Sequence, residues 1–187
     1  CITVVNTVYD FRNEKANPEK RWPLGKSDES YKLTDLLITD YEEALRLSGE
    51  HDIMAAIRFF QEKEVGSLVI TNGSKNIYAW SSGKFFSPLD LTELPVSAKV
   101  AQQIKCGTCG DTTGCGDNFA GGILASMVMQ LNAGAQTPDL KEACCWGVVS
   151  GGYTCFYIGG TYFEELPGEK FQKLKPYYEH YKQQLGN

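Results

Sequence analysis

Residues 107–122 read GTCGDTTGCGDNFAGG, a glycine-rich loop that runs directly into an apolar helical pattern. The backbone at Gly114 and Gly116 can approach a ligand closely, and Cys115 between them adds a further N–H group. The positive end of the helix that follows is directed at the same place. The stretch therefore predicts a binding site for a phosphate group or another oxyanion.

Asp117 is unusual in an anion site, because its carboxylate repels an anion bound beside it. A general base that takes a proton from an attacking hydroxyl group explains its place there. The simpler alternative is an acid that only interacts favourably with the helix dipole. The glycines around Asp117 favour the general base, and we interpret the loop as the reaction centre.

Composition and length describe an ordinary globular chain. With 187 residues, the chain fits one domain with a sizeable core. The net charge is −5, and Lys and Arg are dispersed, which argues against a nucleic-acid binder. No apolar run approaches the roughly 20 residues that span a bilayer. The sequence shows no signal-peptide pattern. We therefore expect a cytoplasmic protein without a membrane partner.

The chain contains seven cysteines, an odd number that is untypical of a secreted disulfide framework. Reduced thiols are therefore expected. Cys106 and Cys109, with Cys115 nearby, have the spacing of part of a zinc site. Neither His51 nor His180 stands at ligand spacing from them. Small, half-buried thiols in a tight loop are the simpler interpretation.

The rest of the sequence alternates between strands and helices. Apolar runs predict strands at residues 2–9, 33–39, 67–71 and 76–80, with a hairpin into 84–86. Helical spacing of apolar residues predicts helices at residues 41–47, 52–64, 119–131, 138–157 and 167–185. Residues 13–30 are expected to form a long surface loop, which Trp22 and Leu24 anchor either by packing on the surface or at the edge of a substrate site. Residues 94–100 are expected to be extended.

This order of elements predicts an α/β fold with three αβα layers and a mostly parallel central sheet. In such sheets, ligands bind beyond the carboxyl ends of the strands. Asp40, the turn at residues 71–73 and the glycine loop all follow strands, so we expect them at one edge of the sheet. A buried strand opens the chain with nothing before it. This leads us to expect the C-terminal part of a longer protein.

Residues 111–122, DTTGCGDNFAGG, resemble the second signature of the ribokinase-like (PfkB-type) carbohydrate kinases, Asp-Thr-x-Gly-x-Gly-Asp-x-Phe. Residues 40–43 (DYEE) resemble the Asn-x-x-Glu element of that family, and residues 70–75 (ITNGSK) resemble its Thr-x-Gly segment. The resemblance identifies residues 1–187 as the nucleotide-binding and catalytic C-terminal part of a single ribokinase-like domain. The Gly-Gly sugar contacts and lid strands of the family's N-terminal part have no counterpart here.

The resemblance implies an ATP-dependent kinase that transfers the γ-phosphoryl group to a hydroxyl group of a sugar. Asp117 would be the general base, and the N–H groups of residues 114–117 would form an anion hole for the transferring phosphoryl group. Thr71, Gly73 and Gly159 would contact the nucleotide. The residues themselves leave open that Thr71 and Gly73 form only a turn.

The resemblance also implies metal sites. Glu43 and Asp40 would act on Mg²⁺ through its water shell. Asp111 and the Thr113 carbonyl match family positions that often hold K⁺. Simpler roles stay open, with Glu43 on a solvated helix face and Asp111 as a turn-capping acid.

Two residues depart from the family pattern. Cys115 replaces the usual Ala, which can crowd the anion hole or make it sensitive to oxidation. Asp40 replaces the usual Asn and adds negative charge beside the metal. A nucleoside kinase of the same fold is one alternative function. A non-catalytic nucleotide or phosphosugar binder is another, although a binder gains nothing from Asp117. A homodimer is among the assemblies that the resemblance allows.

Overall fold

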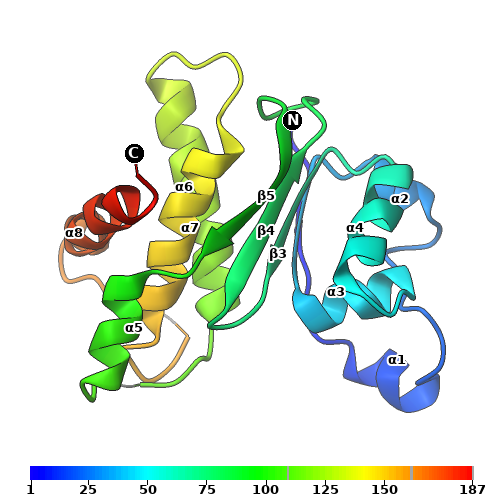
Figure 1. The fold of residues 1–187 in the computed structure, drawn as a ribbon, viewed down its shortest axis with the longest axis horizontal. Coiled ribbons are helices and arrows are strands. Elements are labelled where there is room, and N and C mark those ends of the chain that lie inside the picture. Colours follow the sequence, from blue (N-terminus) through cyan, green and yellow to red (C-terminus); the bar gives the residue numbers. More distant parts are fainter. Residues whose placement is uncertain (109, 161, 187) are drawn as a thin grey trace. The chain divides into compact units, whose positions relative to one another are not determined.

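The computed structural model describes residues 1–108, 110–160 and 162–186. The chain divides into two compact units, Cys1–Leu94 and Pro95–Asn187. We call the first the sheet unit and the second the helical unit, after the elements that Figure 1 shows in each.

The sheet unit is built on one five-stranded sheet in the order β1-β2-β3-β4-β5. The strands are β1 (Val4–Asn6), β2 (Leu36–Asp40), β3 (Ser67–Thr71), β4 (Asn76–Ser81) and β5 (Leu89–Pro95). β1 pairs with β2 and β2 with β3 in parallel, whereas β3 pairs with β4 in antiparallel orientation. The α/β class is therefore confirmed, with a mixed sheet. The expected strand at residues 84–86 is wrong, because these residues form bends.

The parallel register places polar residues side by side where the strands end. Asp40, the last residue of β2, lies opposite Thr71, the last residue of β3. Thr7 continues the pairing just beyond β1, since its N–H donates to the carbonyl of Ile38. The expectation that strand-end residues share one edge thus holds for Asp40 and Thr71.

Helices α3 (Tyr41–Ser48) and α4 (Ile53–Glu62) lie beside the sheet in this unit (Figure 1) and confirm the two helices expected there. Their limits follow local signals, because Asp40 caps the start of α3 and Gly49 ends it in the left-handed conformation. Buried residues of both helices and of β2 and β3 form one hydrophobic core, which includes Leu37, Ala44, Leu47, Ile57, Phe60, Leu68 and Ile70.

The segment expected as a surface loop is partly helical and partly buried. Helices α1 (Phe11–Ala16) and α2 (Glu29–Lys32) form at its two ends. α1 begins where the Asp10 carboxylate accepts the N–H groups of Arg12 and Asn13. Trp22 is only 3% exposed, so its expected surface position is wrong. The backbone N–H of Trp22 donates to the carbonyl of Arg46, which holds this residue against the core.

The helical unit contains α5 (Ala98–Lys105), α6 (Cys115–Asn132), α7 (Leu140–Thr154) and α8 (Glu169–Gln184). The extended segment expected at residues 94–100 is confirmed only for residues 94 and 95, which end β5. Residues 98–100 are helical, because the Ser97 side chain accepts the N–H of Val100 and starts α5. α6 begins at Cys115 rather than at Phe119, because Gly114 forms its N-cap in the left-handed conformation. None of the helices within the described ranges is both long and apolar enough to cross a membrane.

α6 and α7 pack backbone against backbone. A β-carbon placed on Gly122 of α6 would lie 2.6 Å from the carbonyl oxygen of Trp146 in α7. A β-carbon on Gly151 of α7 would lie 2.9 Å from the carbonyl oxygen of Cys115 in α6. The two helices can approach this closely only because these positions carry no side chain.

Candidate active site

The glycine loop ends in the first turn of α6. Gly114 has φ of +73°, and its carbonyl accepts the first helical hydrogen bond from Asn118 N–H at 2.9 Å. The N–H of Cys115 donates to the Thr112 carbonyl at 3.2 Å, so this predicted anion-hole donor is already engaged. Gly116 is exposed, and no atom from a more distant part of the described chain lies within 4 Å of the place that a β-carbon there would take. The helix start is therefore open to a ligand at Gly116.

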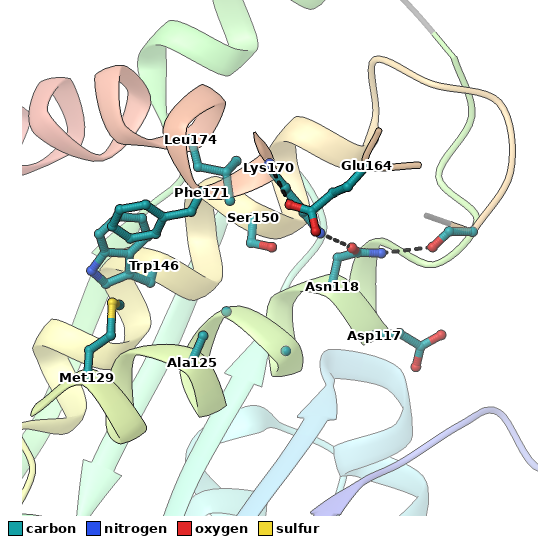
Figure 2. Close-up of a pocket in the computed structure, with 13 residues that line it drawn as sticks. Asp117, Asn118, Ala125, Met129, Trp146, Ser150, Glu164, Lys170, Phe171 and Leu174 are labelled. Carbon is teal, nitrogen blue, oxygen red and sulfur yellow. Dashed lines mark hydrogen bonds between the residues drawn. The ribbon is translucent and has the colours of Figure 1, made fainter. Parts of the chain in front are cut away.

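Asp117 lies on this first turn and is exposed. Figure 2 shows its carboxylate pointing away from the contact between Asn118 and Lys170. Asp117 is thus placed with the glycines expected to surround it, and its side chain is accessible to a substrate.

The loop before α6 is held against the segment that follows α7. The N–H of Gly110 donates to the Cys155 carbonyl at 2.8 Å, and the N–H of Asp111 donates to the Tyr157 carbonyl at 2.9 Å. A β-carbon on Gly114 would overlap the carbonyl oxygen of Gly160. Two segments about 45 residues apart thus pack backbone against backbone, which the glycines of the loop allow.

Asp111 connects the two segments through its side chain. One carboxylate oxygen accepts the N–H of Thr113 at 2.8 Å, and the other accepts the N–H of Gly159 at 3.2 Å. These backbone hydrogen bonds lower the pKa of Asp111, so its carboxylate stays ionised. The structure therefore brings together three predicted site residues, and Asp111 does cap a turn, as the simpler interpretation expected.

Asn118 is a site residue that the sequence analysis missed. Its amide nitrogen donates to the carbonyls of Gly114 and Gly160, both at 2.8 Å. Its amide oxygen accepts from the Nζ of Lys170, and only 8% of the residue is exposed. The sequence contained a signal for this role, because a side chain four residues after Gly114 lies on the same helix face, one turn away. Asn118 ties the two glycine segments together.

A cavity of about 530 Å³ adjoins this helix start inside the helical unit (Figure 2). Its apolar lining includes Trp146 of α7 and Phe171 of α8, which stack with ring centroids 5.1 Å apart. Its polar lining includes Asn118, Glu164 and Lys170. Burial lowers the pKa of Lys170. The cavity therefore combines an aromatic wall with a few polar groups, as small-molecule sites do.

In the sheet unit, Asp40 and Glu43 form a reciprocal cap at the start of α3. The Asp40 carboxylate accepts the N–H of Glu43 at 2.8 Å, while the Glu43 carboxylate accepts the N–H of Asp40 at 3.4 Å. The same Glu43 oxygen accepts the Thr7 hydroxyl at 2.5 Å and the Thr39 hydroxyl at 3.5 Å. Thr7, which sequence reasoning missed, thus joins the strand ends to the capped helix.

Glu43 is 6% exposed, which excludes the solvated helix face as its position. Burial raises the pKa of Glu43, and the neighbouring Asp40 carboxylate acts in the same direction. Two adjacent carboxylates are the hard oxygen groups that Mg²⁺ prefers. Because one oxygen of the Glu43 carboxylate already accepts three internal donors, the pair fits a role through metal-bound water rather than a closed cage of side chains.

No group of three His, Cys, Asp or Glu within the described ranges is arranged to hold a metal ion. Cys109, one of the cysteines considered for zinc, lies outside those ranges. The carboxylates of Asp40 and Glu43 therefore fit a magnesium ion only when phosphate and water oxygens complete its shell.

Thr71 and Gly73 belong to the hairpin between β3 and β4. The N–H of Asn72 donates to the Asn76 carbonyl at 3.0 Å, and Gly73 has φ of +54°. The backbone here is the simple turn that the sequence left open. Gly73 is exposed, and no atom beyond its chain neighbours lies within 4 Å of a β-carbon built there, so this side of the turn is open. Thr71 borders Asp40 at the strand ends.

The chain is similar to a known protein family and to solved structures. The model of the pfkB family carbohydrate kinases matches residues 5–166. No curated protein sequence matches the chain.

Three solved structures share the fold. Ribokinase from Thermotoga maritima is 20% identical with a TM-score of 0.55, over 88% of this chain and 46% of that chain. Aminoimidazole riboside kinase from Salmonella enterica is 18% identical with a TM-score of 0.59, over 81% and 44%. A putative ribokinase II from E. coli, in complex with ATP and Mg²⁺, is 19% identical with a TM-score of 0.57, over 81% and 41%. The chain spans less than half the length of each.

Proposed function

The chain belongs to the pfkB family of carbohydrate kinases, and we propose that it forms the catalytic and nucleotide-binding part of an enzyme that transfers the γ-phosphoryl group of ATP to a hydroxyl group of a sugar. The observation that carries this proposal is the exposed Asp117 on the first turn of α6, directly after the glycines at 114 and 116. Phosphoryl transfer to a hydroxyl group requires a general base and a site that binds the transferring anion. We assign the first role to the Asp117 carboxylate and the second to the start of α6.

Asp117 accepts the proton of the substrate hydroxyl as the oxygen attacks the γ-phosphorus. The N–H of Gly116 and the positive end of α6 stabilise the charge on the transferring group. The N–H of Cys115 contributes less than the sequence suggested, because the Thr112 carbonyl already accepts it. Asn118 keeps the Gly114 carbonyl turned toward its own amide and so holds the shape of the loop.

In the sheet unit, Thr71 and Gly73 are the proposed nucleotide contacts; in the helical unit, the proposed contact is Gly159. The exposed position of Gly73 in its turn supports this role. The E. coli structure in the comparison, which contains ATP and Mg²⁺, supports the same cofactors for this family member.

Two ion sites complete the proposal. Asp40 and Glu43 would hold water molecules of a magnesium ion, which supplies charge neutralisation between the phosphates when bound. The ionised Asp111, together with the carbonyl of Thr113, would hold K⁺ beside the glycine loop.

A nucleoside is the second candidate for the acceptor. It is favoured by the likeness to aminoimidazole riboside kinase, which was solved with its riboside. Both candidates place the same hydroxyl chemistry at Asp117, so the acceptor must be determined by experiment.

The decisive experiment measures ATP turnover by the full-length protein, across a panel of sugars and nucleosides, for wild type and for Asp117→Asn. We expect kcat to fall by about 10²–10⁴-fold in the variant, with the Kd for ATP unchanged. Asp90→Asn, which changes an exposed acid on β5, is the matched control and should keep full turnover. Equal turnover by Asp117→Asn and wild type would refute the general base. ATP binding without turnover in any protein would indicate a non-catalytic binder.

A further inference from the structure

Two cysteine thiols meet at the start of α6. The Sγ atoms of Cys115 and Cys155 lie 3.3 Å apart, and both residues are half-buried. Cys115 is the first residue of α6, and Cys155 is the C-cap of α7. The pair thus joins the beginning of one helix to the end of the other.

The backbone around both cysteines holds them in this position. The Gly151 backbone of α7 packs against the Cys115 carbonyl, where a β-carbon would lie 2.9 Å away. On the other side, the Cys155 carbonyl accepts the N–H of Gly110 at 2.8 Å. The two sulfur atoms are therefore brought together by packing rather than by a chance rotamer of an exposed side chain.

We propose that Cys115 and Cys155 form a reversible disulfide that switches off the anion site of this protein. The link itself depends only on the thiol geometry, whereas its effect on turnover rests on the proposed kinase function. A disulfide has its sulfurs at about 2.05 Å, so the two atoms need to approach by roughly 1 Å.

The oxidant we assign is a low-molecular-weight disulfide. The Cys155 thiolate attacks one of its sulfurs, which forms a mixed disulfide and releases one small thiol. Cys115 then attacks the Cys155 sulfur, loses its proton to water and releases the second small thiol. Two protein thiols are oxidised and one small disulfide is reduced to two thiols, so atoms and electrons balance.

Cys155 is the thiol that reacts first. The Sγ atoms lie within hydrogen-bond distance, so the Cys115 thiol can donate to a thiolate at Cys155 and stabilise it for the first attack. By contrast, Cys144 and Cys145 are buried within α7, and burial raises the pKa of Cys145 to about 12. The buried pair is therefore inert, and oxidation is directed to the helix start.

Closing the link acts on the anion site through the first turn of α6. Cys115 lies between Gly114 and Gly116, so movement of its sulfur toward Cys155 moves the backbone that presents the Gly116 N–H. An anion hole tolerates little displacement, because its donors must lie at hydrogen-bond distance from the developing charge.

The first test maps the link in the full-length wild-type protein after treatment with oxidised glutathione. We expect a cross-linked peptide pair that contains Cys115 and Cys155, lighter than the two free peptides by two hydrogen atoms. Cys155→Ser should abolish this pair, and Cys106→Ser, which removes an exposed thiol, should leave it intact. Absence of the pair in the wild type, while other thiols are modified, would overturn the proposal whether or not the protein is a kinase.

The second test compares turnover before and after oxidation. Oxidation should lower kcat by about 10²-fold in wild type, as loss of an anion-hole donor does, and dithiothreitol should restore it. The Cys155→Ser variant should keep its turnover after treatment with oxidised glutathione. If that variant does not fold, Cys155→Ala serves for the same measurement. A mapped disulfide that leaves turnover unchanged would overturn the switch. If the protein shows no kinase activity, ATP binding before and after oxidation provides the same comparison.

Discussion

The carbonyl oxygen of Gly160 occupies the place that a β-carbon on Gly114 would need. Gly114 also has φ of +73°, which side chains disfavour. Two separate constraints, one conformational and one steric, therefore require glycine here. Both follow from the contact between the loop before α6 and the segment after α7.

Gly114→Ala should destabilise the protein through both constraints. The conformational cost is about 1–2 kcal/mol, and the overlap with Gly160 adds about 1–3 kcal/mol. Gly134→Ala is the matched control, because Gly134 has φ of +93° but no described atom near its β-carbon position. It should show only the conformational cost. Urea unfolding of both variants measures the difference, and equal losses would show that the Gly160 segment moves aside.

Asn118→Ala should loosen the glycine loop. The substitution removes the donors to two carbonyls and leaves Lys170 without its amide partner, which we expect to cost about 1–3 kcal/mol. Turnover should fall with little change in the nucleotide Kd if the loop shapes the reaction centre. Asn132→Ala, an exposed position at the other end of α6, is the control. Unchanged stability and turnover in Asn118→Ala would contradict the role given to this residue.

Glu43 should make stability depend on pH. Its pKa is raised above the ordinary value of 4.5, so the folded state binds the proton more tightly than the unfolded state. The stabilising contribution of protonated Glu43 to the free energy of unfolding is therefore present below about pH 4.5 and is lost as pH rises through the raised pKa. Glu43→Gln should remove this dependence of the unfolding free energy on pH. Glu42→Gln changes an exposed residue of the same helix and should retain it.

The measurement is the free energy of unfolding of the three proteins, from urea titrations at a series of pH values from about 4 to 8. Relative to wild type, Glu43→Gln should become more stable as pH rises. The same pH slope in all three proteins would contradict the burial effect at Glu43.

Trp22 should behave as a core residue. Trp22→Ala is expected to cost about 3–5 kcal/mol, since it removes a buried ring that packs edge-on against Tyr9. Trp22→Phe should cost less than about 1.5 kcal/mol. The phenyl ring keeps the apolar contact and omits the indole N–H, for which the described residues provide no acceptor. Thermal unfolding compares the two variants, and a mild effect of Trp22→Ala would place the indole at the surface.

Local signals in the sequence predicted much of the fold. α3 and α4 could be predicted because apolar spacing, the Asp40 cap and the Gly49 stop all agree. β3 could be predicted from the apolar run at its centre, residues 68–70. α1 and the burial of Trp22 could not, because the polar residues around them look like a loop. Their structure depends on a local cap and on a contact with Arg46 that lies far along the chain.

Some features of the candidate site could likewise be predicted from the sequence, and others could not. The glycines and Asp117 form one continuous motif, so their proximity follows from the sequence alone. The burial of Glu43 depends on hydroxyl groups of Thr7 and Thr39 from two neighbouring strands, which no local pattern indicates. The contact of Cys115 with Cys155 similarly requires the packing of α6 on α7.

The reciprocal glycine contacts of α6 and α7 make α7 a determinant of the reaction geometry, although the roles proposed for the site's base and anion donors fall on α6. A methyl group added at Gly151 would press on the carbonyl of the first residue of α6, and one added at Gly122 would press on the carbonyl of Trp146. Such added methyl groups would force the two helices apart. Libraries built to alter the acceptor should therefore hold both positions as glycine and introduce diversity elsewhere.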